Sequence, residues 1–222
     1  MEPVLFDMDG VILEGPRTDP QVYDEAADAA LADLGADPTP AQRRTLRRHD
    51  LEGVEAACTD LGIDSDRFWR LKEHYASVGT HERIRSGDRR LYDDVDAIAD
   101  LAARTPIGLV TNNRHETAAF VADHLETEFG ASFDVVHGRD PTFEGYRRRK
   151  PDPYYVERAL TDLDSDRGVY VGDFPKDVSA GTAAGLETAF LRRPHNRDLA
   201  CPADATVELE SLSEVGDVAS ID

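Results

Sequence analysis

The stretch that most constrains this chain is Val4-Leu5-Phe6-Asp7-Met8-Asp9-Gly10-Val11-Ile12. Three apolar residues lead directly into two aspartates one residue apart, and an apolar run of this kind is typical of a strand buried on both faces. Two carboxylates at the end of such a strand need water, a cation or a reactant beside them, because burying unpaired charge costs a great deal of free energy. Ligands bind at the carboxyl ends of strands in α/β sheets, so the stretch predicts an active site at Asp7 and Asp9.

Farther along, the apolar residues alternate between helical and strand spacing. Strand-like runs occur at residues 107–110, 133–136, 168–171, 188–191 and 205–209. Before and between these runs, helical spacing predicts helices over 91–101, 113–129, 153–163 and 178–184. Strands separated by helices predict an α/β fold with a doubly wound, Rossmann-like parallel sheet and right-handed crossovers.

A second block, between the first strand and residue 82, has no strand-like run. Helical spacing recurs over 21–34, 41–49, 51–61 and 68–78, where the last two patterns stop at Gly62 and Gly79. The sequence therefore predicts an α/β core over residues 1–15 and 82–222, with a small all-helical insertion over 16–81. An arginine cluster within it, at positions 43, 44, 47 and 48, either attracts an anion or forms pairs with nearby acids, and we favour the pairs.

The composition narrows the range of partners. The 222 residues carry a net charge of −20, and 22 of the 25 basic residues are arginine. A large net charge maintains solubility where salt screens self-repulsion, so we interpret it as adaptation to the high-salt cytoplasm of a halophilic archaeon. Nucleic acid is not expected as a partner, because its phosphates would be repelled.

The absence of other signals also sets expectations. The two cysteines lie far apart and form no C-x-x-C motif, which favours a reduced, cytoplasmic protein. The sequence shows no signal peptide and no apolar run long enough to span a membrane, so we expect no membrane partner. A monomer or a homodimer is expected.

Polar residues follow several of the predicted strands. Thr111 and Asn112 follow the strand at 107–110, Lys150 precedes a helix, and Asp173 and Asp177 follow the strand at 168–171. With Asp7 and Asp9 they bring carboxylates, a hydroxyl and an amine to one rim of the sheet. Hard oxygen ligands with few neutralising cations indicate Mg²⁺. A hydroxyl, a lysine and free amides at helix starts indicate a phosphoryl group.

These residues, in this order, resemble the motifs of the haloacid dehalogenase-like (HAD) hydrolase superfamily, and specifically those of its phosphatases. Asp7-Met8-Asp9-Gly10 matches the first motif, D-x-D-G, and Thr111 matches the second. Lys150 matches the third, and Asp173 with Asp177 matches the fourth, G-D-x-x-x-D. The resemblance covers essentially the whole chain and implies that the helical insertion is a cap of the first type.

The resemblance also implies a role for each residue. Asp7 would be the nucleophile that forms an aspartyl-phosphate, and Asp9 would be the acid/base. Mg²⁺ would be held by Asp7, the backbone carbonyl of Asp9, Asp173 and, directly or through water, Asp177. The transferring phosphoryl group would be bound by Thr111, Asn112 and Lys150.

One departure and several alternatives accompany this interpretation. The fourth motif has Phe174 where the family commonly has serine or threonine. The expected activity is Mg²⁺-dependent hydrolysis of a small phosphorylated metabolite, either phosphoglycolate or a sugar or nucleotide monophosphate. A phosphomutase of the same superfamily, similar to β-phosphoglucomutase, is the first alternative. A non-catalytic phosphate-binding protein is the second.

Overall fold

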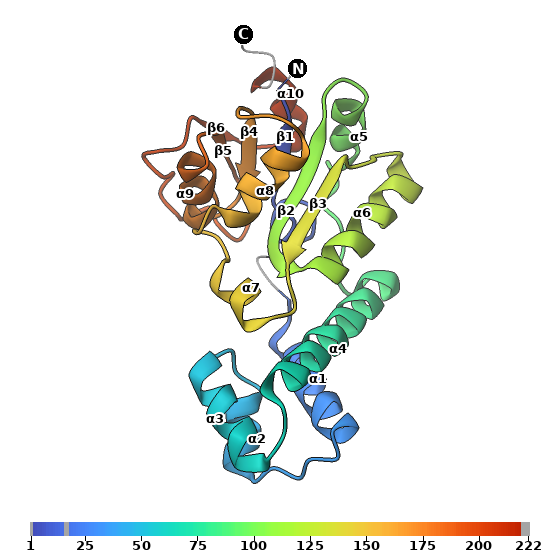
Figure 1. Cartoon of the computed structure of the whole chain (residues 1–222). Helices are drawn as coiled ribbons and strands as arrows, with labels where there is room; N and C mark the ends of the chain where they lie inside the picture. Colours follow the sequence, from blue (N-terminus) through green and yellow to red (C-terminus); the bar gives the residue numbers. More distant parts are fainter. Residues whose placement is uncertain (1, 16–17, 219–222) are drawn as a thin grey trace. The chain divides into compact units, whose positions relative to one another are not determined.

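The computed structural model describes residues 2–15 and 18–218 and contains a six-stranded, all-parallel sheet. Its strands are β1 (Val4–Phe6), β2 (Ile107–Arg114), β3 (Val135–Arg139), β4 (Val169–Gly172), β5 (Glu187–Leu191) and β6 (Val207–Leu209). They lie in the order β3-β2-β1-β4-β5-β6, so β1 is central (Figure 1). The predicted α/β fold with a parallel sheet is confirmed. Because the order of the strands reverses beside β1, its carboxyl end is where a ligand site is expected in such a sheet.

Helices cover both faces of the sheet. They are α5 (Asp96–Ala102), α6 (His115–Phe129), α8 (Tyr154–Asp162), α9 (Pro175–Ala183) and, after the 3₁₀ turn Leu212–Glu214, α10 (Val215–Val218). Leu5 of β1 packs with Val156 of α8 and Ala180 of α9. Phe6, the next residue, instead lines a small cavity with Ile98 of α5. Successive side chains of a strand point to opposite faces, so α8 and α9 cover one face and α5 the other (Figure 1).

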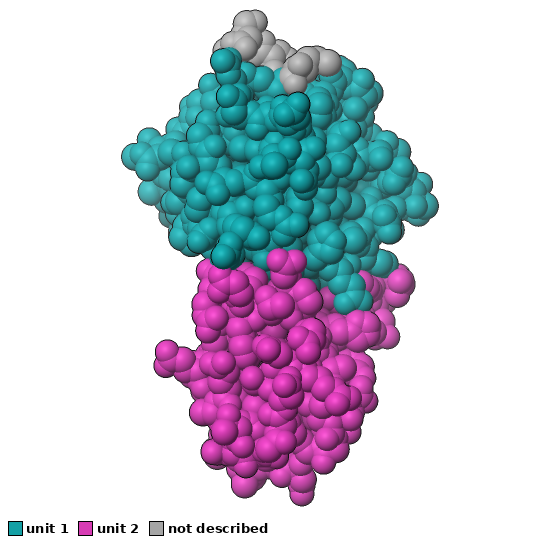
Figure 2. Space-filling model, in the orientation of Figure 1, with its two compact units in different colours: residues 1–17, 89–139, 148–222 teal, residues 18–88, 140–147 magenta. Residues whose placement is uncertain are grey.

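The chain divides into two compact units, which Figure 2 colours separately. The α/β unit comprises residues 1–17, 89–139 and 148–222, and the helical unit comprises residues 18–88 and 140–147. The helical unit contains α1 (Pro20–Asp33), α2 (Pro40–Leu46), α3 (Leu51–Leu61), α4 (Ser65–Ser86) and α7 (Phe143–Arg147). The expected insertion was 16–81, and its first two residues lie outside the described residues. The helical unit also includes residues 82–88 and the later segment 140–147.

Aromatic and aliphatic side chains form the core of the helical unit. Trp69 and Phe68 are fully buried with Leu31 and Leu46, and Phe143 of α7 joins this cluster. The ring centroids of Trp69 and Phe143 are 4.9 Å apart. The helical unit therefore has an apolar core of its own. Each large side chain in it contributes about 1.5–3 kcal/mol to the free energy of folding when it is removed from water.

The arginine-rich helix α2 forms ion pairs inside the helical unit. Arg43 lies 2.8 Å from Asp28, and Arg47 lies 2.5 Å from the other oxygen of the same carboxylate. Asp28 belongs to α1, so these contacts join α1 to α2. The interpretation of the cluster as arginines that pair with acids is confirmed for these two residues.

Several predicted helix boundaries are wrong. Helix α4 continues through Gly79 to Ser86. Gly79 does not end the helix but allows α1 to approach closely, since a Cβ at this position would lie 3.3 Å from Val22. Helix α5 begins at Asp96, because Leu91 instead forms a bridge with Leu13. Helix α9 begins at Pro175, three residues early, since proline suits the first helical position.

Two other boundary errors concern the strands next to the site. Strand β2 runs to Arg114, four residues past its predicted end, and α6 starts at His115 rather than at residue 113. An irregularity in register between Val110 and Arg114 lets Arg114 pair with Arg139 of β3. Thr111 and Asn112 therefore lie within a strand. Strand β3 spans 135–139 rather than 133–136.

The segment before α8 also differs from expectation. Helix α7 was not predicted, since five residues are too few to show a helical period. Helix α8 starts at Tyr154, with Pro153 at the position that precedes it, rather than at Pro153. The predicted cap of this helix still forms in part, because Asp152 Oδ1 accepts a hydrogen bond of 2.9 Å from the Tyr154 amide.

Candidate active site

Most of the predicted site residues lie in or just after the carboxyl-terminal halves of three neighbouring strands. Asp7 directly follows β1, and its amide donates to Val171 O of β4 at 2.9 Å, so the sheet pairing continues into the site. Thr111 lies in β2 on one side of β1, and Asp173 follows β4 on the other. Asp177 lies in the first turn of α9. The topology β2-β1-β4 thus brings these side chains to one edge of the sheet.

Lys150 pairs with two of the carboxylates. Its Nζ lies 2.9 Å from Asp7 Oδ1 and 2.8 Å from Asp177 Oδ1, and all three side chains are at most 3% exposed. The same ammonium donates to the Tyr170 hydroxyl at 2.6 Å, and that hydroxyl donates to Val110 O at 2.6 Å. Tyr170 thus helps to fix the position of the ammonium between two acids.

The charges of this cluster shift its pKa values in different directions. Burial raises the pKa of Asp7, but the ammonium groups of Lys150 and Lys176 outweigh burial and leave that pKa lowered. Burial tends to lower the pKa of Lys150, yet Asp177 and Asp7 hold it well above its ordinary value. Burial raises the pKa of Asp177 despite Lys150, and it raises the pKa of Asp173 to about 6. Asp7 is therefore ionised at neutral pH, as a nucleophile must be.

Three carboxylates of this site form a set that fits a metal ion. Oxygen atoms of Asp7, Asp173 and Asp177 all lie within 4.8 Å of one another. Asp173 Oδ1 is buried and has no hydrogen-bond partner. Oxygen donors of this kind suit a hard cation such as Mg²⁺, and one lysine cannot neutralise three buried acids. The side chain of Asp9 is not part of this set.

Both oxygens of the Asp9 carboxylate have partners within the α/β unit. Arg89 donates to Oδ1 at 2.7 Å, and the Asn113 side-chain amide donates to Oδ2 at 2.9 Å. The Asp9 side chain is 16% exposed, whereas that of Asp7 is 3% exposed. The two aspartates of the first motif thus have different surroundings, and only Asp7 touches Lys150.

Thr111 and Asn112 are placed differently relative to this cluster. The Thr111 hydroxyl accepts a bond from the Asn113 amide at 3.1 Å, which leaves its own hydrogen available to a ligand. The Asn112 side chain instead binds the backbone of Lys150. Its Oδ1 accepts from Lys150 N at 2.7 Å, and its Nδ2 donates to Lys150 O at 3.0 Å. Asn112 fixes the segment that carries Lys150, and its role toward a phosphoryl group stays a prediction.

Two glycines of the motifs are required by close contacts. A Cβ on Gly10, whose φ is +86°, would lie 2.1 Å from Asp173 Oδ2. A Cβ on Gly172 would lie 2.3 Å from the Cβ of Asp177. No side chain fits at either position, so these glycines let the loops that carry the carboxylates approach one another.

Sequence reasoning missed Arg89, Asn113, Tyr170 and His195, all of which contact the predicted site residues. His195 Nε2 lies 2.5 Å from Asp173 Oδ2. Asn113 directly follows Asn112, and Tyr170 lies in the strand that ends before Asp173. Arg89 and His195 belong to no motif and lie far in sequence from the aspartates they contact.

Comparison with known proteins identifies the family. The sequence profile of the haloacid dehalogenase-like hydrolases matches residues 1–185. The chain belongs to this family. It is 28% identical over 207 residues to a phosphoglycolate phosphatase of Yersinia pestis, which covers 87% of this chain and 82% of that enzyme. It is also 33% identical over 109 residues to a D-glycero-D-manno-heptose-1,7-bisphosphate 7-phosphatase of Chlorobaculum tepidum. This second match covers 42% of the chain and only 55% of that relative.

Solved structures support the same fold. CbbY from Rhodobacter sphaeroides, solved in complex with phosphate, superposes with a TM-score of 0.61 over 97% of this chain and 96% of its own, at 21% identity. The prediction of a hydrolase of the HAD family is confirmed, and its assignment as a phosphatase is supported by the named activities of both relatives. No helix within residues 2–15 and 18–218 combines the length and the apolar character that crossing a membrane requires.

Proposed function

We propose that this HAD-family phosphatase is a Mg²⁺-dependent phosphomonoester hydrolase that acts through an aspartyl-phosphate at Asp7. The observation that carries the proposal is the buried cluster of Asp7, Asp173, Asp177 and Lys150 at the end of β1. It combines an ionised carboxylate, an oxygen set for a cation and an ammonium for phosphoryl oxygens. Transferring phosphoryl groups are stabilised mainly by such fixed charges.

The proposed reaction has two steps. A carboxylate oxygen of Asp7 attacks phosphorus, the bond between phosphorus and the leaving oxygen breaks, and Asp9 donates its proton to that oxygen. Asp9 then takes a proton from a water molecule, whose oxygen attacks phosphorus and releases Asp7 and inorganic phosphate. Mg²⁺, held by Asp7, Asp173, Asp177 and the Asp9 backbone carbonyl, would supply positive charge for the phosphoryl oxygens.

Lys150 and Thr111 would bind the phosphoryl group during both steps. Lys150 presents one ammonium that lies 2.9 Å from the nucleophile, so the charge it offers is close to the reacting centre. The Thr111 hydroxyl retains a hydrogen to donate. Asn112 would act through Lys150, whose backbone it holds on both sides.

We further propose that the helical unit serves as a cap that restricts substrates to small phosphorylated metabolites. The support is the place of its larger segment, residues 18–88, between the first motif and the remainder of the α/β unit. Phosphoglycolate and sugar or nucleotide monophosphates are the substrate classes to screen, since one aligned relative is named a phosphoglycolate phosphatase. The high acidic charge leads us to propose a cytoplasmic enzyme of a halophile, to be assayed in molar salt.

The test is release of phosphate from p-nitrophenyl phosphate in molar KCl, with and without MgCl₂. We expect Mg²⁺-dependent hydrolysis by the wild type and none above background by Asp7→Asn, whose amide cannot act as the nucleophile. Equal rates for the two proteins would refute the proposal. Incubation with a hexose 1-phosphate separates hydrolysis from mutase activity, because a mutase yields an isomeric phosphate rather than free phosphate.

A further inference from the structure

His195 binds the carboxylate of Asp173 from outside the four motifs. Its Nε2 lies 2.5 Å from Asp173 Oδ2, and Asp173 is fully buried. The ring also stacks on Phe174, with centroids 5.9 Å apart and planes inclined by 23°. Phe174 is the residue at which the fourth motif departs from its usual form, and here its ring supports the imidazole that contacts the neighbouring aspartate.

The second ring nitrogen of His195 meets Tyr92. The Tyr92 hydroxyl lies 3.3 Å from His195 Nδ1. A carboxylate oxygen accepts hydrogen bonds, so Asp173 Oδ2 accepts from His195 Nε2. In the neutral imidazole Nδ1 then carries no hydrogen and accepts from the Tyr92 hydroxyl.

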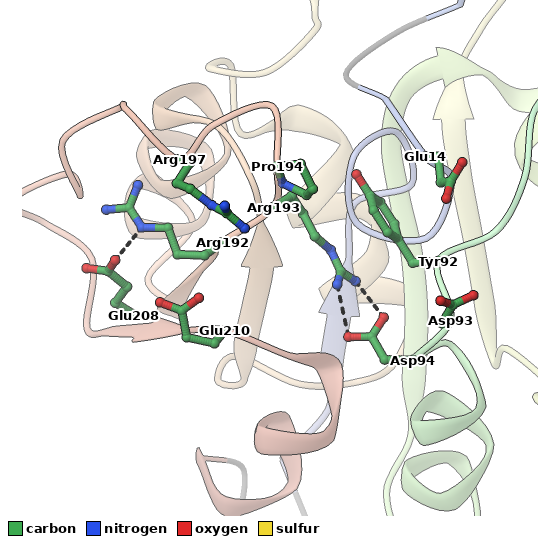
Figure 3. A pocket seen from close by; sticks show the side chains of 10 residues that line it. All are labelled: Glu14, Tyr92, Asp93, Asp94, Arg192, Arg193, Pro194, Arg197, Glu208 and Glu210. Atoms are coloured by element: carbon green, nitrogen blue, oxygen red, sulfur yellow. Dashed lines mark hydrogen bonds and ion pairs between the residues drawn. The ribbon is translucent and has the colours of Figure 1, made fainter.

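Tyr92 is itself held in place. The guanidinium of Arg193 lies 4.0 Å from the centre of its ring. Arg193 forms two hydrogen bonds of 2.8 and 2.9 Å with Asp94 and donates to Val11 O at 2.8 Å. Figure 3 shows the Arg193–Asp94 pair beside the Tyr92 ring at the edge of a surface pocket. The hydroxyl of Tyr92 thus approaches His195 from a fixed ring.

The loop that carries His195 is also fixed to the site. The side-chain amide of Asn196 donates to Asp173 O at 2.8 Å and to Leu191 O at 2.9 Å, and Asn196 is fully buried. On the other side, a Cβ on Gly10 would lie 3.0 Å from the His195 ring. The imidazole is therefore packed against the first motif and anchored to the fourth.

We propose that His195, oriented by Tyr92, is a positioning residue that holds Asp173 Oδ2 so that Oδ1 is presented to the metal ion. The asymmetry of the carboxylate supports this: Oδ2 has a hydrogen-bond donor, and Oδ1 is buried without one. Groups that hydrogen-bond to metal ligands commonly change metal affinity 10- to 100-fold when removed. The inference rests on the proposed function, because it needs Asp173 to be a metal ligand.

The experiment is isothermal titration of the full chain with MgCl₂ alone, in molar KCl and without substrate. We expect His195→Ala to raise the Mg²⁺ dissociation constant about 10- to 100-fold. His195→Gln, whose amide can replace the Nε2 donor, should restore most of the affinity. His124→Ala, a half-buried histidine of α6, is the matched control and should bind Mg²⁺ as the wild type does. If His195→Ala unfolds in EDTA, His195→Phe keeps the stacking on Phe174 and serves as the same test.

A double-mutant cycle tests whether Tyr92 acts on Mg²⁺ binding through His195. Tyr92→Phe should weaken Mg²⁺ binding in the wild type and have no further effect in His195→Ala, because Tyr92 acts only through the imidazole. Additive effects, or wild-type affinity in His195→Ala, would overturn the inference. Asp173→Asn separates the proposed metal site from the positioning role of His195. If Asp173→Asn leaves Mg²⁺ binding intact, the proposed metal site itself fails, whereas if only the His195 variants bind normally, the positioning role alone fails.

Discussion

Replacing Lys150 with methionine removes the single cation that contacts two buried acids. The Lys150 Nζ lies 2.9 Å from Asp7 and 2.8 Å from Asp177. At an effective dielectric constant of about 20, each contact contributes about 6 kcal/mol of attraction. Desolvation of the ammonium opposes this by several kcal/mol, and breaking a buried pair from one side costs about 3–5 kcal/mol net. We expect Lys150→Met to lose about that much free energy of unfolding in the metal-free protein.

The pH dependence of this loss has a definite sign. Without the ammonium, the pKa of Asp7 in the folded state rises above its unfolded value, and the pKa of Asp177, which burial already raises, rises further. The folded variant then binds more protons than the unfolded chain, so its stability falls as pH rises above about 4. The deficit relative to the wild type should therefore be larger at pH 8 than at pH 5.

Urea unfolding in molar KCl with EDTA measures both effects, and thermal unfolding should show a decrease of about 6–20 °C. Arg90→Met is the matched control, since it removes one positive charge from a side chain that is 72% exposed. It should cost less than about 1 kcal/mol. An unfolding free energy of Lys150→Met within about 1 kcal/mol of wild type at both pH values would refute this charge balance.

Three further changes test other contacts. Asp94→Asn should lower the free energy of unfolding by about 2 kcal/mol at pH 7, because it weakens charged bonds to Arg193 and to the Leu212 amide. Burial raises the Asp94 pKa but these bonds lower it further, so the difference from wild type in urea unfolding should shrink below pH 4. Gly10→Ala should abolish phosphate release, since its Cβ would collide with Asp173. Arg89→Met should lower kcat about 10- to 100-fold with little change in Mg²⁺ affinity, because it removes a hydrogen bond that holds the carboxylate of Asp9. General acid–base catalysis as a whole contributes about 10²–10⁴-fold to the rate.

The central part of the site follows from sequence because it depends on local rules. Asp7, Thr111 and Asp173 each follow or end an apolar run that can only be a buried strand. A parallel sheet brings the carboxyl ends of adjacent strands together, so their proximity is a consequence of topology. Asp177 lies one helical turn beyond Asp173 and is carried to the same place by α9.

The contacts that sequence reasoning missed depend on loop paths and on strand register. His195 lies 22 residues after Asp173, beyond β5, and its approach depends on how the loop after β5 folds back. Arg89 and Arg90 are adjacent and chemically identical, yet Arg89 binds Asp9 whereas the Arg90 side chain is 72% exposed. No local pattern distinguishes them. Boundary errors have a similar origin, since the pairing of Arg114 with β3 extends β2 beyond its apolar residues.

Lysine is rare in this chain, and two of the three lysines occupy positions that favour an ammonium over a guanidinium. Lys72 and Lys150 are both buried, and each gathers several acceptors around one nitrogen. Lys72 donates to Leu46 O at 2.9 Å and Arg48 O at 2.5 Å, at the end of helix α2, where cations are favoured. A compact ammonium fits such a point, whereas a planar guanidinium directs its donors outward in a fork. Two of the three lysines therefore lie where acceptors converge, and Lys150 differs from Lys72 because it also lies beside the ends of the central strands.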